Sequence, residues 1–364
     1  MIFISAGEIS GDLYAGGLLR ALKQQCPDLQ AYGLGGPQLQ AAGLRLLADV
    51  RHLAAVGLSE NTGSVGYFWQ LKQQIAAWLR QVKPQVVILV DFQGFNLQLG
   101  QVAKQLGIPV IYFIAPQEWI WGLPGGLKRI KHSVDLILAV FQPEADFYQQ
   151  HGIKTEFIGH PLLDSLPGYS RAEAQAQLGL SPQHTTVCWM PGSRRTELKR
   201  LLPVMAQLKS ALEPNTQHLL PLADQFLDEP QVHALGAQIY LLEQRYAAMM
   251  ASDLIFAASG TVILEAALLG KPVIALYQVS ELTYQLARRV LKHPWMTLPN
   301  LLLHQAVVPE YIQHFPIAQM VAQGHLEMQN TAKWQALPQQ LRPYLGNSGA
   351  LQKGAAVILE YLNR

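Results

Sequence analysis

Cysteine and charge are both scarce in this chain of 364 residues. Its two cysteines, Cys26 and Cys188, are far apart and match no metal-ligand spacing, which disfavours a disulfide framework. Charged residues make up only 14% of the chain and the net charge is +2, which disfavours a disordered chain and a general nucleic-acid binder. No apolar run reaches the roughly 18–20 residues of a membrane-spanning helix, and no signal peptide is visible. We therefore expect a reduced, cytoplasmic protein that does not cross a membrane.

Apolar residues, in contrast, make up half of the chain, and they stand in short runs separated by helical patterns. Continuous apolar runs between helices indicate parallel strands that are covered on both faces. The runs lie at residues 1–5, 31–34, 86–90, 109–114, 136–140 and 156–159, and again at 186–190, 218–222, 238–241, 254–258 and 273–277.

The pattern restarts after a turn-rich stretch, Ser165–Tyr169, which indicates a linker. The fold class that this predicts is α/β, with two Rossmann-like doubly wound domains facing a central cleft. We expect the first domain to span residues 1–165 and the second 166–344, with a last helix at about 345–364 that packs back on the first domain.

Two strand ends in the first half carry acids. The turn ISAGEISGD (Ile4–Asp12) is glycine-rich like a phosphate cradle, yet Glu8 and Asp12 add two negative charges to it. Asp12 is expected to be structural, at a helix start where its charge suits the dipole. Asp91 ends the strand 86–90; it is either an ordinary turn or N-cap residue, or a general base whose pKa is raised near apolar walls.

Two strand ends in the second half suit an anion. In PGSRRTE, Arg194 offers a planar fork for a diphosphate at the start of a helix, although an arginine pair in a loop is often only solvated surface. In ASGTVILE, Gly260 and Thr261 open a helix directly after a strand, and Glu265 lies one turn further along the same face. An ordinary helix cap explains the second stretch alone, but the two together indicate a nucleotide-diphosphate site.

Three other features leave alternatives open. His160 follows a strand near the domain junction and is either a hinge and packing residue or a catalytic one. Trp119 and Trp121 lie in a loop and serve either core packing or an apolar groove. The helical pattern 67–80, with Trp69 and Trp78, is either a sheet-packing face or a surface for a membrane or acyl chain.

In this order along the chain, the motifs resemble the lipid-A-disaccharide synthase family, inverting glycosyltransferases of the two-Rossmann GT-B type. The matching stretches are AGEISGD from Ala6, GGP from Gly35, AVGLSE from Ala55, DFQGFN from Asp91, APQEWIW from Ala115, FIGHP from Phe157, PGSR from Pro191, ASGT from Ala258 with Glu265, and TLPN from Thr297.

The resemblance implies transfer of a sugar from UDP-2,3-diacylglucosamine to 2,3-diacylglucosamine 1-phosphate, which gives a β-1,6-linked disaccharide and releases UDP. Because both substrates carry acyl chains, it also implies a peripheral enzyme on the inner face of the cytoplasmic membrane. No metal or cofactor and no nucleic-acid partner are expected, and a homodimer is left open.

Carried over residue by residue, the resemblance assigns Asp91 as the base, with Glu8 beside it. The substrate-binding residues that it implies are Ser10, Gly11, Asn96, Trp119, His160 and Asn300. The nucleotide-binding residues that it implies are Ser193, Arg194, Ser259, Gly260, Thr261 and Glu265.

Alternative hypotheses remain at this point. A UDP-sugar 2-epimerase would share the double-Rossmann frame but needs no lipid surface, so the apolar loop at Trp119–Trp121 argues against it. A divergent paralogue acting on another glycolipid is a second alternative. A non-catalytic binding protein is a third, against which Asp91, Arg194 and Glu265 speak.

Overall fold

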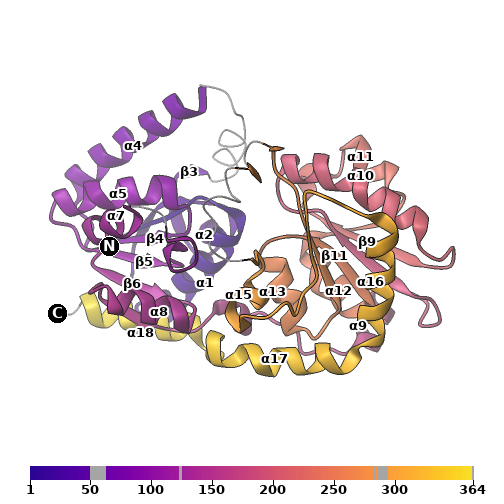
Figure 1. Ribbon diagram of the computed structural model, residues 1–364. Helices are drawn as coiled ribbons and strands as arrows, with labels where there is room; N and C mark the ends of the chain where they lie inside the picture. Colours follow the sequence, from indigo (N-terminus) through magenta and orange to yellow (C-terminus); the bar gives the residue numbers. More distant parts are fainter. Residues whose placement is uncertain (50–62, 123–124, 282–283, 286–293, 363–364) are drawn as a thin grey trace. The chain divides into compact units, whose positions relative to one another are not determined.

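The computed structural model describes residues 1–49, 63–122, 125–281, 284–285 and 294–362 (Figure 1). The motif at residues 55–60 lies outside them. The chain divides into two compact units, one formed by Met1–Ser165 with Tyr344–Arg364 and the other by Leu166–Pro343.

Over its described residues, the first unit forms a seven-stranded sheet in the order β3-β2-β1-β4-β5-β6-β7, and all neighbouring strands are parallel. Its elements are β1 (Ile2–Ala6), α1 (Ile9–Gln25), β2 (Ala31–Gly35), α2 (Pro37–Ala41), β3 (Leu44–Asp49), α4 (Gly63–Val82), β4 (Val87–Val90), α5 (Gln93–Gln105), β5 (Val110–Phe113), α6 (Glu118–Trp121), α7 (Gly126–Ser133), β6 (Leu136–Ala139), α8 (Gln142–Gln150), β7 (Thr155–Phe157), η1 (Pro161–Asp164) and α18 (Ala350–Leu362).

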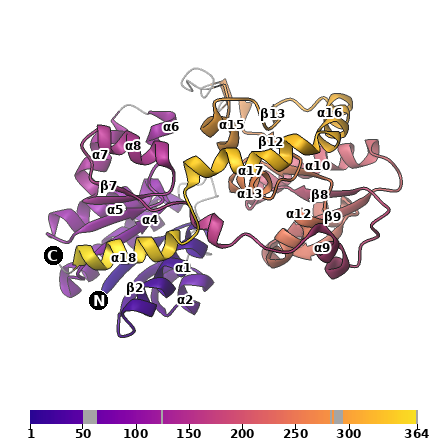
Figure 2. The same ribbon diagram turned by 90° about the horizontal axis from the view of Figure 1, so that it is seen from below.

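Alternate strand residues of this sheet face the helices α4, α5 and α7. Val87 and Leu89 of β4, for example, share one buried cluster with Leu79 of α4 and Leu99 of α5. On the other side α18 packs against α1 (Figure 2). The contact is close because a Cβ at Gly17 of α1 would lie 2.6 Å from the side chain of Leu351.

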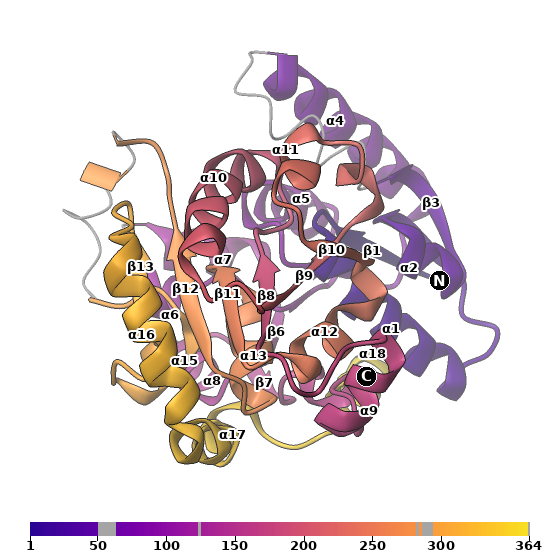
Figure 3. The ribbon, with the colours of Figure 1, turned by 90° about the vertical axis from the view of Figure 1, so that its right-hand side faces the viewer.

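Over its described residues, the second unit forms a six-stranded parallel sheet in the order β10-β9-β8-β11-β12-β13. Its elements are α9 (Arg171–Leu178), β8 (Thr186–Met190), α10 (Arg195–Ala211), β9 (Gln217–Leu222), η2 (Asp224–Phe226), α11 (Pro230–Ala234), β10 (Gln238–Leu241), η3 (Leu242–Gln244), α12 (Arg245–Ala251), β11 (Leu254–Ala258), α13 (Thr261–Leu268), β12 (Val273–Tyr277), α15 (Leu298–Leu303), β13 (Glu310–Ile312), α16 (Ile317–Gln329) and α17 (Thr331–Leu345). Figure 3 shows this unit, with α10 and α16 packed on the same face of the sheet.

Each sheet has a point where the strand order reverses. In the first unit β1 lies between β2 and β4, and in the second β8 lies between β9 and β11. Ligands of doubly wound sheets bind beyond the carboxyl ends of the strands at this switch point. The loops that leave β1 and β4 carry Glu8 and Asp91, and those that leave β8 and β11 carry Arg194 and Gly260.

Candidate active site

The β1–α1 turn and the β4–α5 turn of the first unit lie against each other. A Cβ at Gly11 would lie 3.6 Å from the Cβ of Asp91, an ordinary contact distance, so the two turns are direct neighbours. At Gly7 a Cβ would lie 2.1 Å from the ring of Phe92, so no larger residue fits. Glu8 occupies the N-cap position of α1, and both Glu8 and Ser10 are half-buried. The structure thus brings Gly11 beside Asp91 and places Glu8 and Ser10 in the same turn as Gly11.

Asp91 itself has an unusual backbone. Its φ is +50° and that of Phe92 is +51°, so two successive residues other than glycine lie in the left-handed region. The carboxylate accepts a hydrogen bond at 2.9 Å from the amide N–H of Phe92. Strain of this kind costs of order 1–3 kcal/mol per residue and concentrates at functional sites. The turn therefore marks Asp91 independently of any motif.

Asp12 lies in the first turn of α1, as expected, and its carboxylate also binds the start of a second helix. Its carboxylate accepts hydrogen bonds from the backbone N–H groups of Gly36 (2.7 Å), Gln38 (2.9 Å) and Leu39 (3.1 Å). These groups belong to the start of α2, not to α1, in which Asp12 lies. Asp12 thus ties α1 to the β2–α2 turn by satisfying free helix donors.

Asn96 is fully buried and turned toward the backbone. Its amide nitrogen lies 3.2 Å from the carbonyl oxygen of Ser5, 3.1 Å from that of Val90 and 2.8 Å from that of Asp91. Its amide oxygen accepts a bond of 2.6 Å from the Ser5 hydroxyl. This geometry favours support of the Asp91 turn over contact with a substrate.

An aromatic row connects Trp119 with His160. The ring centroids of Trp119 and Phe141 lie 5.6 Å apart, and those of Phe141 and His160 lie 5.0 Å apart. The ring of Tyr14 ends the row, with its centroid 5.9 Å from that of His160. The indole nitrogen of Trp119 is buried and has no hydrogen-bond partner among the described residues. A buried donor of this kind suits a ligand that accepts a hydrogen bond.

His160 is held as a neutral ring. Its Nδ1 accepts a hydrogen bond from the backbone N–H of Leu162 at 3.1 Å, so the ring proton lies on Nε2. Burial lowers the pKa of His160 to about 3. The backbone N–H of His160 also donates to the carbonyl of Leu345, and this bond links the two chain segments that form the unit. A neutral ring in this place favours packing and hydrogen-bond donation over proton exchange near neutral pH.

The pattern in α4 is mainly a sheet-packing face. Leu71, Ile75 and Leu79 are buried, and the Trp78 ring lies 5.5 Å from that of Phe3. Trp69 lies away from this face and is 59% exposed.

In the second unit, the β8–α10 loop is stabilised by a residue that the sequence analysis did not assign. The carboxylate of Glu197 accepts hydrogen bonds from the backbone N–H groups of Ser193 (2.9 Å) and Arg194 (3.2 Å). Glu197 thus occupies the two N–H groups that directly precede α10, which begins at Arg195. The Arg194 side chain is the remaining expected phosphate contact in the loop. Glu197 stands at the third position of α10, after the N-cap Arg194, which is where a glutamate side chain reaches back to the N-cap backbone.

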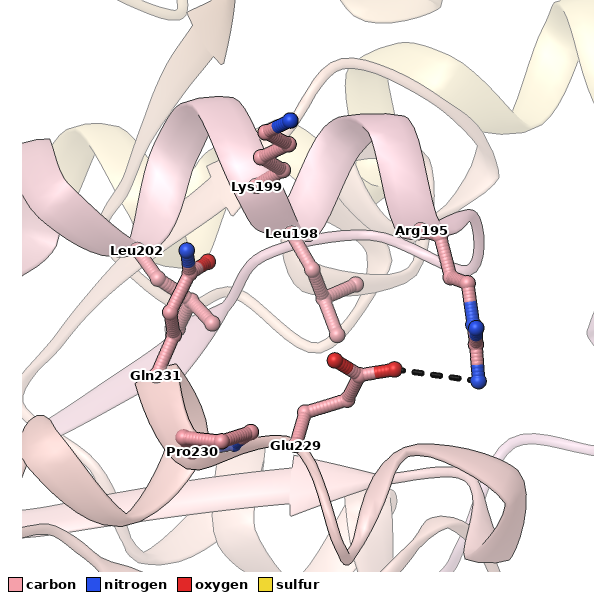
Figure 4. A pocket seen from close by; sticks show the side chains of 7 residues that line it. All are labelled: Arg195, Leu198, Lys199, Leu202, Glu229, Pro230 and Gln231. Carbon is pink, nitrogen blue, oxygen red and sulfur yellow. Dashed lines mark ion pairs between the residues drawn. The ribbon is translucent and has the colours of Figure 1, made fainter.

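Arg195 has different surroundings from Arg194. Its guanidinium lies 3.1 Å from the carboxylate of Glu229, across a groove of about 270 Å³ between α10 and α11 (Figure 4). The floor of this groove includes Leu198 and Leu202.

The β11–α13 loop places the other nucleotide candidates together. Ser259 and Gly260 directly precede α13, which begins at Thr261. Glu265 is one turn further along and is nearly buried; its Oε1 accepts a 2.9 Å hydrogen bond from the Tyr246 hydroxyl and lies 3.6 Å from the guanidinium of Arg245. The free N–H groups of a helix start suit a phosphate, and a fixed carboxylate suits ribose hydroxyls.

Asn300 is engaged within the protein. Its amide nitrogen donates to the carbonyl of Val308 and to the carboxylate of Glu310, each at 2.8 Å, and its oxygen accepts from the N–H of Val308. The residue is fully buried. Its geometry favours a structural link between α15 and β13 over direct contact with a ligand.

Two features are absent from the part of the chain that the structure describes. No group of three or more His, Cys, Asp or Glu side chains there is arranged to hold a metal ion. None of the helices described is both long and apolar enough to span a membrane.

Each of the two α/β units has a sheet of parallel strands with polar loops at its switch point. Two such units define a double-Rossmann protein of the GT-B type, a fold that many nucleotide-sugar enzymes share. Solved structures share this fold. The UDP-N-acetylglucosamine 2-epimerase of Neisseria meningitidis bound to UDP-GlcNAc matches with a TM-score of 0.62 and 11% identity, over 100% of this chain and 98% of that one. MurG of Acinetobacter baumannii matches with a TM-score of 0.56 and 16% identity, over 99% of each chain. At these identities the likeness shows the fold alone.

Sequence comparison decides the family. The model of the lipid-A-disaccharide synthetase family matches residues 2–350, and the chain belongs to this family of glycosyltransferases. The lipid-A-disaccharide synthase of Geobacter metallireducens is 35% identical over 375 residues, covering 100% of this chain and 97% of the relative. That of Synechocystis is 36% identical over 387 residues, covering 100% and 98%. The resemblance seen in the motifs is thereby confirmed, and the epimerase alternative has only a shared fold behind it.

Proposed function

We propose that this chain transfers 2,3-diacylglucosamine from UDP-2,3-diacylglucosamine to 2,3-diacylglucosamine 1-phosphate, forms the β-1,6-linked disaccharide and releases UDP. The family match along residues 2–350 supports this reaction. The observation that carries the mechanism is Asp91, held in a left-handed turn at the switch point of the first sheet.

The chemistry divides between the two units. In the first, which we assign to residues 1–165 with the last helix, the Asp91 carboxylate takes the proton of the acceptor 6-hydroxyl. The acceptor oxygen then forms a bond to C1 of the donor sugar while the bond from C1 to the UDP oxygen breaks. A single displacement of this kind inverts the configuration at C1. Glu8 and Ser10 lie in the β1–α1 turn next to that of Asp91, where they suit sugar hydroxyls, and Trp119 offers its indole N–H.

The second unit, residues 166–344, binds the leaving group. Arg194 and the start of α13 at Ser259, Gly260 and Thr261 stabilise the negative charge of the departing diphosphate. Glu265 holds the ribose hydroxyls, with its carboxylate oriented by Tyr246 and Arg245. Because both substrates carry acyl chains, we place the enzyme on the inner face of the cytoplasmic membrane as a peripheral protein, with the exposed Trp69 among the candidates for contact.

The direct test incubates purified protein with both diacylated substrates in detergent micelles and measures disaccharide and UDP by mass spectrometry. We expect both products in equal amounts. Absence of disaccharide from a preparation that still binds UDP would overturn the proposed reaction.

The base assignment is tested by Asp91→Asn. Asparagine keeps the acceptor for the Phe92 N–H and tolerates a positive φ well, so the turn is preserved. We expect kcat to fall about 10²–10⁴-fold with UDP affinity unchanged, since only proton transfer is lost. Asp28→Asn, at an exposed position, is the matched control. Near-normal turnover of the Asp91 variant would move the base elsewhere.

A further inference from the structure

The carbonyl oxygen of Asp91 accepts two hydrogen bonds from buried side chains. The Tyr112 hydroxyl donates to it at 2.6 Å and the Asn96 amide at 2.8 Å. Tyr112 and Asn96 are both 0% exposed. Burial, and then the charge of Asp91, raise the pKa of the Tyr112 hydroxyl well above its usual range, so it remains a donor at working pH.

The donors come from elements on both sides of β4. Tyr112 lies on β5, which pairs with β4 through Leu89↔Tyr112. On the other side, Ser5 of β1 pairs with Leu89 as well, and its hydroxyl donates to the Asn96 oxygen at 2.6 Å. The carbonyls of Ser5, Val90 and Asp91 can only accept, so they fix the nitrogen end of the Asn96 amide toward them, and the Ser5 hydroxyl donates to the oxygen end. Three neighbouring elements therefore converge on one peptide group.

That peptide group also holds the Asp91 side chain, because its N–H, that of Phe92, donates to the carboxylate at 2.9 Å. The carbonyl belongs to the plane between Asp91 and Phe92, and its orientation sets ψ of Asp91 and φ of Phe92. Both residues have positive φ, which each side chain other than glycine disfavours. Without the two donors, rotation of this plane would relieve the strain at Phe92 and turn its N–H away from the Asp91 carboxylate, which would then lose the hydrogen bond that holds it in place. The Phe92 ring against Gly7 limits the same rotation.

We infer that Tyr112 is a positioning residue for the proposed base, and that Asn96 and Ser5 complete the same device. It acts through the Asp91 peptide plane and touches no substrate. The inference rests on the proposed function, because it concerns the group that we assign to proton transfer. It differs from ordinary core stabilisation in that the Tyr112 hydroxyl contributes chiefly to turnover.

The test is Tyr112→Phe, which removes one hydroxyl and leaves the ring in the core. We expect kcat to fall about tenfold, because a small misplacement of a catalytic group is costly in rate. KM for both substrates and the affinity for UDP should stay within about twofold, since no binding contact is removed. Tyr240→Phe is the matched control: the Tyr240 hydroxyl is also buried on a main-chain carbonyl, that of Leu178 at 3.1 Å, but in the second unit. It should keep the native kcat.

Ser5→Ala gives a second, independent variant, which also serves if the phenylalanine variant folds poorly. It removes the hydrogen bond to the Asn96 oxygen and so loosens the amide, while the three carbonyls still hold the nitrogen; we expect a smaller loss of kcat, about threefold, again without a change in KM. A kcat within twofold of native in Tyr112→Phe, or a rise in KM in proportion to the loss, would overturn the inference. If Asp91→Asn retains full turnover, the proposed base fails instead. An inactive Asp91→Asn beside a fully active Tyr112→Phe would refute the positioning role alone.

Discussion

At the scale of single residues, neighbours in sequence have different tasks. Arg194 and Arg195 are adjacent, yet Arg195 pairs with Glu229 across the groove between α10 and α11, and its side chain is 73% exposed. Arg194 is the N-cap residue of α10 at the switch point of the second sheet. The resemblance names only Arg194 as a nucleotide ligand, and the structure adds that Arg195 is engaged in a surface ion pair.

This difference gives a prediction with a built-in control. Arg194→Ala should weaken UDP binding about 10–100-fold, because hydrogen bonds from a charged group to phosphate contribute about 1.5–3 kcal/mol. Arg195→Ala should leave the dissociation constant within about threefold, since exposed pairs contribute little. Isothermal titration calorimetry with UDP measures both. Equal losses of UDP affinity in the two variants would contradict the different roles of Arg194 and Arg195.

His160 makes stability depend on pH. Burial lowers the pKa of His160 to about 3 from an ordinary 6.5, so the unfolded chain binds a proton that the folded protein does not. The contribution of the neutral His160 to the unfolding free energy is therefore fully present above pH 6.5 and is lost as the pH falls from 6.5 toward 3. His160→Asn keeps an acceptor for the Leu162 N–H but does not titrate. Between pH 7.5 and 5.5 we expect its unfolding free energy in urea to fall about 1.4 kcal/mol less than that of the native protein. Parallel pH profiles would contradict this.

At the scale of elements, apolar runs were enough to predict most strands of the two sheets. The runs at 186–190, 238–241, 254–258 and 273–277 are strands with these bounds, and those at 86–90 and 136–140 differ by one residue at one end. The strand β3 was not predicted. Its residues are only partly buried at the sheet edge, so no continuous apolar run marks it. The helix α5 begins at Gln93, directly after the left-handed turn at Asp91 and Phe92, and no apolar run marks that start in the sequence.

The candidate site was predictable in its loops but not in its supports. Polar residues after strands mark the loops, whereas a polar residue looks the same in sequence whether it faces a ligand or a backbone. Asn96 and Asn300 belong to the second kind, since buried amides must find partners and both find them in main-chain groups. Tyr112 stands inside an apolar run, where nothing in the sequence sets its hydroxyl apart from a core ring.

At the scale of the whole molecule, the chain encloses two separate cores. One cluster of buried residues joins the first sheet to α4, α5 and α7, and another joins the second sheet to α10 and α16. The last helix belongs to the first unit, because α18 packs on α1 and its Ile358 is fully buried. A chain built in this way should unfold in two steps that respond to different changes.

Calorimetry can separate these steps. We assign UDP binding to the second unit, so UDP should stabilise only one of the two transitions. At a concentration one hundred times its dissociation constant, it should raise the unfolding free energy of that transition by about 2.7 kcal/mol. Ile358→Ala should lower only the other, by about 2–5 kcal/mol, because it leaves a cavity between α18 and the rest of the first unit. Leu326→Ala is the control: this leucine is 59% exposed on α16, and its loss should change neither transition by more than about 0.5 kcal/mol. If UDP and Ile358→Ala move the same transition, then either UDP binds the first unit or the two cores unfold as one.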